Sequence, residues 1–156
     1  MSIDQFTKLI KEKHILFSRF EKVTEEMLFC NANELERLLT DREWLIDQIN
    51  RIDEKMICCY ESAETGQKLK ETVFNEGNPD DLDEDFFEIH NLASQTRSIV
   101  TRLTETETQV GIRLRLELEQ ILTQIKSTNR GTEAQASRFL SAKETAALGP
   151  FHVSNA

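Results

Sequence analysis

The sequence contains few residues that interrupt helices. Its 156 residues include only two prolines and five glycines, while 30% of the residues are charged. Sheet proteins need turn residues at short intervals, so this scarcity argues against a β-sheet fold. Many charged residues with few helix breakers favour long helices. We therefore predict an all-α protein.

Cysteines and long apolar runs are also scarce. The three cysteines are Cys30 and the adjacent pair Cys58 and Cys59, an odd number in which neighbours rarely bridge, so reduced thiols are expected. No run approaches the ~18 apolar residues that a membrane span needs. Charged residues interrupt the apolar residues of the N-terminus, unlike a signal peptide. These features predict a cytoplasmic protein that does not insert into membranes.

Basic clusters and catalytic motifs are missing as well. The net charge is −9 and the pI about 4.9, which argues against nucleic acid as a partner, because phosphate backbones attract clustered Lys and Arg. There is no Gly-rich phosphate loop or Ser nucleophile motif, and no His and Cys spacing typical of a zinc site. Asp81, Asp83 and Asp85 alternate as in a calcium loop, but Phe86 stands where that loop requires Gly. We predict no enzymatic activity and no cofactor.

The most regular pattern in the chain is a stripe of apolar residues at helical spacing between Asp81 and Ser127. The stripe consists of Phe86, Ile89, Ala93, Val100, Leu103, Val110, Leu114, Leu118, Ile121 and Ile125. Such a pattern over several heptads predicts one long amphipathic helix. Asn78 as the capping residue and Pro79 as the first helical residue place this helix at residues 79–127.

Two further helices are predicted at residues 2–31 and 33–64. Ser2 and Gln5 have the spacing of a capping box at the start of the first helix. Asn33 and Glu36 have the same kind of spacing, so the second helix either starts there or continues the first through a bend. Residues 1–127 would then form an elongated antiparallel bundle or coiled coil of about three long helices. Residues 128–156 would form a mobile C-terminal tail with one weak helical segment.

Two features suggest a site for a partner. Between residues 110 and 125 a second apolar stripe, Ile112 and Leu116, lies roughly opposite Leu114 and Leu118. Either a further core helix or the folded-back tail covers Ile112 and Leu116, or this face binds a partner. Trp44 projects away from the apolar stripe of its helix, either as an interface anchor or against a third helix.

The order of these motifs resembles the FlgN-like flagellar export chaperones. A first helix with Glu21, Glu25 and Glu26 near its end precedes the step Asn31-Ala-Asn-Glu-Leu-Glu-Arg-Leu-Leu. Arg42-Glu-Trp-Leu-Ile-Asp-Gln-Ile follows, and Ser137-Arg-Phe-Leu-Ser-Ala-Lys-Glu is similar to the polar C-terminal end of that family. The similarity extends over most of the chain.

This resemblance implies a cytoplasmic chaperone for type III secretion. Its partners would be the export apparatus and the hook–filament junction proteins, which it would bind before secretion to prevent premature assembly. The expected binding residues are Ile112, Leu116, Phe139, Leu140, Leu148 and Phe151, with Trp44 as a further candidate. A structural coiled-coil oligomerisation protein and a helical regulatory adaptor are the alternatives, and a homodimer is compatible with each of them.

Overall fold

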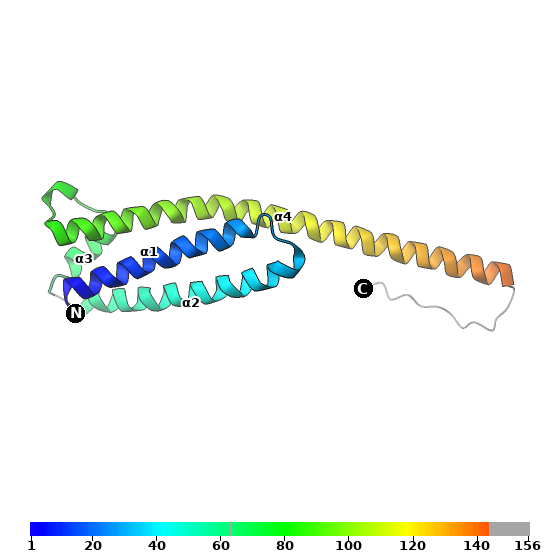
Figure 1. The fold of residues 1–156 in the computed structure, drawn as a ribbon, viewed down its shortest axis with the longest axis horizontal. Coiled ribbons are helices and arrows are strands. Elements are labelled where there is room, and N and C mark those ends of the chain that lie inside the picture. Colours follow the sequence, from blue (N-terminus) through cyan, green and yellow to red (C-terminus); the bar gives the residue numbers. More distant parts are fainter. Residues whose placement is uncertain (63, 144–156) are drawn as a thin grey trace. The chain divides into compact units, whose positions relative to one another are not determined.

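The computed structural model describes residues 1–62 and 64–143, with side chains as far as residue 139. Every element in these ranges is helical (Figure 1). The elements are α1 (Ile3–Glu26), α2 (Ala32–Ser62), α3 (Gly66–Val73), the short 3-10 helix η1 (Pro79–Asp81) and α4 (Glu84–Lys143). The all-α prediction is confirmed. The chain divides into two compact units, Met1–Val110 and Gly111–Ala156.

The first two helices begin at capping boxes. Ser2 Oγ accepts a hydrogen bond from the Gln5 amide at 3.3 Å, and Gln5 Oε1 accepts one from the Ser2 amide at 2.9 Å, as predicted. At the start of α2, Asn31 and Glu34 exchange the corresponding bonds at 2.9 and 3.3 Å. The second helix is therefore separate from α1 and capped by Asn31, two residues before the predicted Asn33. Both asparagines have a glutamate three residues later, so spacing alone does not distinguish them.

The long helix begins later than predicted. Asn78 Oδ1 accepts from the Asp80 amide at 3.1 Å, but this bond caps only η1. α4 starts at Glu84, where Asp83 Oδ1 accepts from the Phe86 amide at 3.0 Å. Asp83 lies at the N-terminal end of the helix dipole, where a negative charge is stabilising.

α4 also ends later than predicted. The prediction ended it at Ser127 and assigned a mobile tail from residue 128, whereas the helix continues through Gly131 to Lys143. A glycine inside a helix costs only about 1 kcal/mol relative to alanine. Good helix formers such as Ala134 and Ala136 follow Gly131, and the next proline along the chain is Pro150. The rest of the predicted tail, residues 144–156, lies outside the described range.

The sequence prediction missed α3 because its apolar pattern is short. Leu69 is buried in the core, and α3 packs on α2. The turn between the two helices brings Gly66 against the backbone of Tyr60. A Cβ at Gly66 would lie 2.1 Å from the Tyr60 carbonyl oxygen, closer than atoms can approach. Only glycine fits this position without a shift of the backbone.

We expect Gly66→Ala to destabilise the protein by about 1–3 kcal/mol, the usual cost of forcing an atom into a filled site. Gly111→Ala is the matched control, since a Cβ there meets no atom within 4 Å. In the interior of α4 this control should stabilise by about 0.5–1 kcal/mol. Urea unfolding followed by circular dichroism measures both changes. Equal effects of the two substitutions would contradict the steric argument.

Residues from all four α-helices form the core of the first unit. Its buried members are Phe6, Ile10, Leu16, Phe20, Leu45, Ile49, Ile52, Met56, Cys59, Leu69, Phe86, Ile89, Ala93, Ile99 and Leu103. Those on α4, apart from Ile99, lie on the predicted stripe of the long helix. On α4, however, Ile99 is buried and Val100 is 40% exposed, the reverse of the prediction. Steps of three and four residues both keep to one helix face, so only packing selects between these neighbours.

Interhelical polar contacts define the directions of the helices in the first unit. Lys11 of α1 pairs with Glu88 of α4, and Glu21 pairs further on with Arg102, so α1 and α4 run parallel there. Lys13 pairs with Asp53 at 2.6 Å, and α1 and α2 run antiparallel across their short connection (Figure 1).

An arginine on the apolar stripe of α2 connects three helices. The Arg42 side chain is only 19% exposed and forms an ion pair with Glu107 of α4. Its guanidinium lies 4.8 Å from the centre of the Phe20 ring, and Nη1 lies 3.8 Å from Met27 Sδ. The pairing with Glu107, whose side chain is 43% exposed, gives the largely covered Arg42 guanidinium an opposite charge.

A double-mutant cycle on Arg42 and Glu107 should therefore give a coupling free energy of about 1 kcal/mol. Arg42→Ala should be the more destabilising single change, because it also removes the packing on Phe20. Urea unfolding of both single variants and the double variant measures the coupling. A value indistinguishable from zero would show that the ion pair does not stabilise the bundle.

Candidate functional site: the exposed apolar segment of α4

The second unit carries a group of large apolar side chains on the surface. Among the side chains of α4 that the structure describes, Val110 is the last buried one, at 3% exposed. Between Val110 and Lys126, six apolar side chains are between 44% and 56% exposed, namely Ile112, Leu116, Leu118, Ile121, Leu122 and Ile125. We call residues 112–125 the exposed apolar segment. Groups of exposed large apolar side chains mark interaction sites in stable proteins.

The later part of the predicted stripe is exposed in the single chain. Leu118, Ile121 and Ile125 continue the stripe that packs in the first unit, and the sequence pattern placed them in a helix seam. No helix among the described residues covers them or Ile112 and Leu116. Whether a further core helix or the folded-back tail covers Ile112 and Leu116 stays a prediction, because residues 144–156 lie outside the described range.

The structure brings together only part of the predicted site. Ile112 and Leu116 lie one helical turn apart on the same face of α4. Phe139 is 44% exposed but lies 23 residues further, about 35 Å along an ideal helix. Trp44 is half-exposed on α2, in the first unit. The side chains of Leu140, Leu148 and Phe151 lie outside the described residues.

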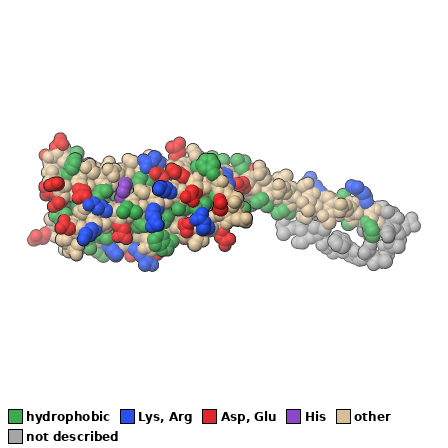
Figure 2. All heavy atoms as spheres, in the orientation of Figure 1, with side chains coloured by type: hydrophobic (Ala, Val, Ile, Leu, Met, Phe, Trp, Pro, Cys, Tyr) green, Lys and Arg blue, Asp and Glu red, His purple; other side chains and the backbone are tan. Residues whose placement is uncertain are grey.

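Charge is distributed unequally between the two units. Residues 1–110 contain 13 Lys and Arg against 24 Asp and Glu, a net charge of −11. Residues 111–156 contain 6 against 4, a net charge of +2, so the exposed apolar segment lies in the weakly cationic unit of an acidic chain. Figure 2 shows basic and acidic side chains intermixed over the visible face of the first unit.

Four charged residues separate the two apolar faces of the segment. Arg113 and Arg115 are followed by Glu117 and Glu119, with a leucine between each pair of neighbours. Arg113 donates to Glu117 Oε1 from Nε at 3.0 Å and from Nη2 at 2.9 Å, an i,i+4 pair that supports the helix.

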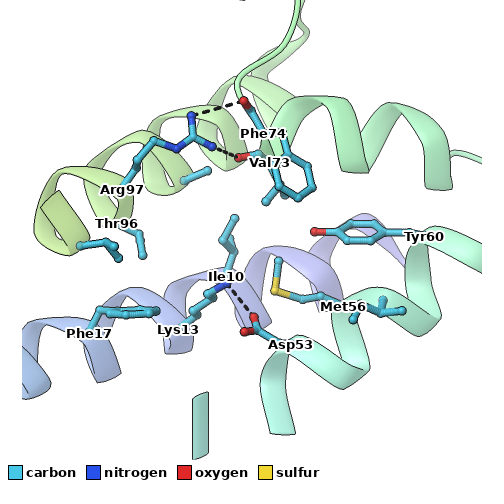
Figure 3. A pocket seen from close by; sticks show the side chains of 13 residues that line it. Ile10, Lys13, Phe17, Asp53, Met56, Tyr60, Val73, Phe74, Thr96 and Arg97 are labelled. Atoms are coloured by element: carbon cyan, nitrogen blue, oxygen red, sulfur yellow. Dashed lines mark hydrogen bonds and ion pairs between the residues drawn. The ribbon is translucent and has the colours of Figure 1, made fainter. Parts of the chain in front are cut away.

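A separate cavity of about 380 Å³ lies between the helices of the first unit. Its walls are mostly apolar, and Ile57 and Phe74 at its edge are half-exposed. The polar groups around it bind one another (Figure 3). Lys13 pairs with Asp53, and Arg97 donates to the Phe74 and Val73 carbonyl oxygens at 3.3 Å. The lining thus suits an apolar guest.

Tyr60, the only tyrosine in the chain, also lines this cavity. Burial raises the pKa of its phenol to about 12, with smaller contributions from the negative charges of Asp53 and Cys59. Its ring centre lies 5.9 Å from that of Phe6 in the core. The neutral phenol is therefore the form that fits the folded protein.

This raised pKa makes stability depend on pH at the alkaline end. The unfolded phenol ionises near pH 10 and the folded one near 12, so its contribution is complete below pH 10 and is lost as pH rises toward 12. Phenolate absorbance should titrate with a midpoint near 12 in the folded protein. Tyr60→Phe should flatten the fall in urea stability across that window. A midpoint near 10 while the protein remains folded would contradict the assignment.

None of the described helices is long and apolar enough to cross a membrane. Comparison of the chain with models of protein families, with curated proteins and with solved structures finds no match.

Proposed function

We propose that this protein is a chaperone that holds an amphipathic helix of a client protein against the exposed apolar segment of α4. The observation that carries the proposal is the set of large apolar side chains that α4 leaves exposed from Ile112 to Ile125. Apolar residues at steps of three and four form the surface that helix-binding proteins present to an amphipathic helix.

The geometry of the segment supports a helical client. Ile112 and Leu116 form one row, while Leu118, Ile121 and Ile125 form another on the opposite side of α4. A client helix can therefore lie along one face without displacing any buried side chain of the first unit. Binding to an already formed helix also avoids the cost of ordering the site.

The identity of the client comes from the sequence resemblance. We infer a cytoplasmic flagellar export chaperone whose clients are hook–filament junction proteins awaiting type III secretion. In this proposal, the three long helices α1, α2 and α4 supply a bundle within Met1–Val110. Phe139, Leu140, Leu148 and Phe151 add contacts to the bound helix.

Calorimetry with terminal peptides of the hook–filament junction proteins from the same cell tests this function. We expect one-to-one binding with a dissociation constant of about 1 μM or tighter, near −8 kcal/mol. Ile112→Asp with Leu116→Asp should weaken binding at least tenfold. Helicity should not change, because both side chains are exposed.

Ile15→Asp with Leu39→Asp is the matched control, since both residues are exposed apolar side chains of the first unit. This control should bind the peptides like the wild type. Unfolding of the Ile112 and Leu116 variant would show that these residues are core. Unchanged peptide affinity would place the client elsewhere.

A further inference from the structure

The charged residues of the exposed apolar segment can pair with those of a second, identical segment that runs in the opposite direction. Leu116 is the centre of this pattern. Arg115 and Arg113 lie one and three residues before it, and Glu117 and Glu119 lie one and three residues after it. Positions at equal distance from Leu116 therefore carry opposite charges.

The helix geometry places these charges on both edges of the Ile112 and Leu116 face. At 100° per residue, Arg113 and Glu117 lie about 60° and 100° from Leu116 on one side. On the other side, Glu119 lies about 60° and Arg115 about 100° from Leu116. A row with Ile112 and Leu116 in the middle is thus bordered on each edge by one arginine and one glutamate.

Two copies of this face match only in the antiparallel direction. A two-fold axis beside Leu116 places the edge that carries Arg113 and Glu117 against the same edge of the second copy. Arg113 of one copy then lies opposite Glu117 of the other, and their positions along the helix axis differ by about 3 Å. Arg115 meets Glu119 in the same way. Each contact occurs twice, giving four Arg–Glu pairs in the dimer. A parallel pairing in register would oppose like charges.

We propose that a second copy of this chain binds the Ile112 and Leu116 face in antiparallel orientation, with the two-fold axis at Leu116. The proposal rests on the proposed function in one respect: the second copy covers the face that a client would use. The dimer would then be the resting form, and a client helix would have to displace the second copy. Closed two-fold symmetry is the commonest arrangement of homo-oligomers.

The contacts within one helix are compatible with this pairing. Glu117 already accepts from Arg113 of its own helix at 2.9 Å. A carboxylate has about four acceptor sites, so Glu117 can also accept from Arg113 of the second copy. The positive charge of residues 111–156 distinguishes this part of the chain from the acidic first unit, which would repel its own copy.

Sedimentation equilibrium of the full chain tests the pairing with two charge-reversal variants. The wild type should show a concentration-dependent dimer. Arg113→Glu with Arg115→Glu leaves four acidic residues on the segment, and Glu117→Arg with Glu119→Arg leaves four basic ones. Each variant alone should dimerise at least tenfold more weakly than the wild type. An equimolar mixture of the two should recover the dimer, because every reversed charge then meets its opposite.

Lys126→Glu with Arg130→Glu is the matched control. It changes the net charge by the same amount on the same helix, outside the complementary pattern, and should leave the dimer unchanged. Circular dichroism of every variant verifies that α4 stays helical. A monomeric wild type, or a mixture of the two reversals that fails to associate, would overturn the proposal. So would a mixture that associates far more tightly than the wild type, because a parallel wild-type pair already opposes like charges and only the mixture relieves them.

Calorimetry with the junction-protein peptides separates this inference from the proposed function. If the wild type is monomeric and still binds a peptide, the self-pairing is wrong and the client function stands. If the mixture restores the dimer and no peptide binds, the second copy is the occupant of the face and the client function is wrong.

Discussion

The length of α4 relative to its neighbours is the constraint on which the rest of the structure depends. α4 has 60 residues, whereas α1 has 24 and α2 has 31. Burying one large apolar side chain stabilises a protein by roughly 1.5–3 kcal/mol, but only where another element covers it. That gain ends at Val110 on α4. Beyond it, the helix depends on local terms such as the Arg113–Glu117 pair, and its apolar residues remain available to another molecule.

Within the first unit, polar pairs fix the register between helices, which apolar packing alone does not specify. Apolar stripes match again after a shift of three or four residues, so they tolerate sliding between helices. A contact such as His14 Nδ1 to Thr96 Oγ1, at 3.2 Å, exists in one register only. The Arg42–Glu107 pair has the same effect between α2 and α4, at the cost of desolvating a guanidinium whose Nε has no hydrogen-bond partner among the described residues.

The sequence was sufficient for the helical class and for the capping box at Ser2, because these depend on local spacing. It was insufficient where two neighbouring residues fit the same local pattern. Asn31 and Asn33 both fit as the cap of α2, and Ile99 and Val100 both fit as the buried residue of α4, so tertiary packing decides between them. The candidate site was predicted in part. Periodicity identified Ile112 and Leu116 as a second face, but the exposure of Leu118 and Ile125 depends on where the covering helices end.

The order of the elements along the chain has a consequence for synthesis. α1 and α2 are joined by a short connection and pack against each other, so closing this pair costs little chain entropy. The contacts of α1 with α4 join residues as much as 82 positions apart, such as His14 and Thr96. On the ribosome, the N-terminal pair can therefore assemble before α4 has been translated. The apolar residues beyond Val110 are translated last, when the folded α1 and α2 pair can already cover the first half of α4. This order shortens the time during which the whole of α4 is uncovered.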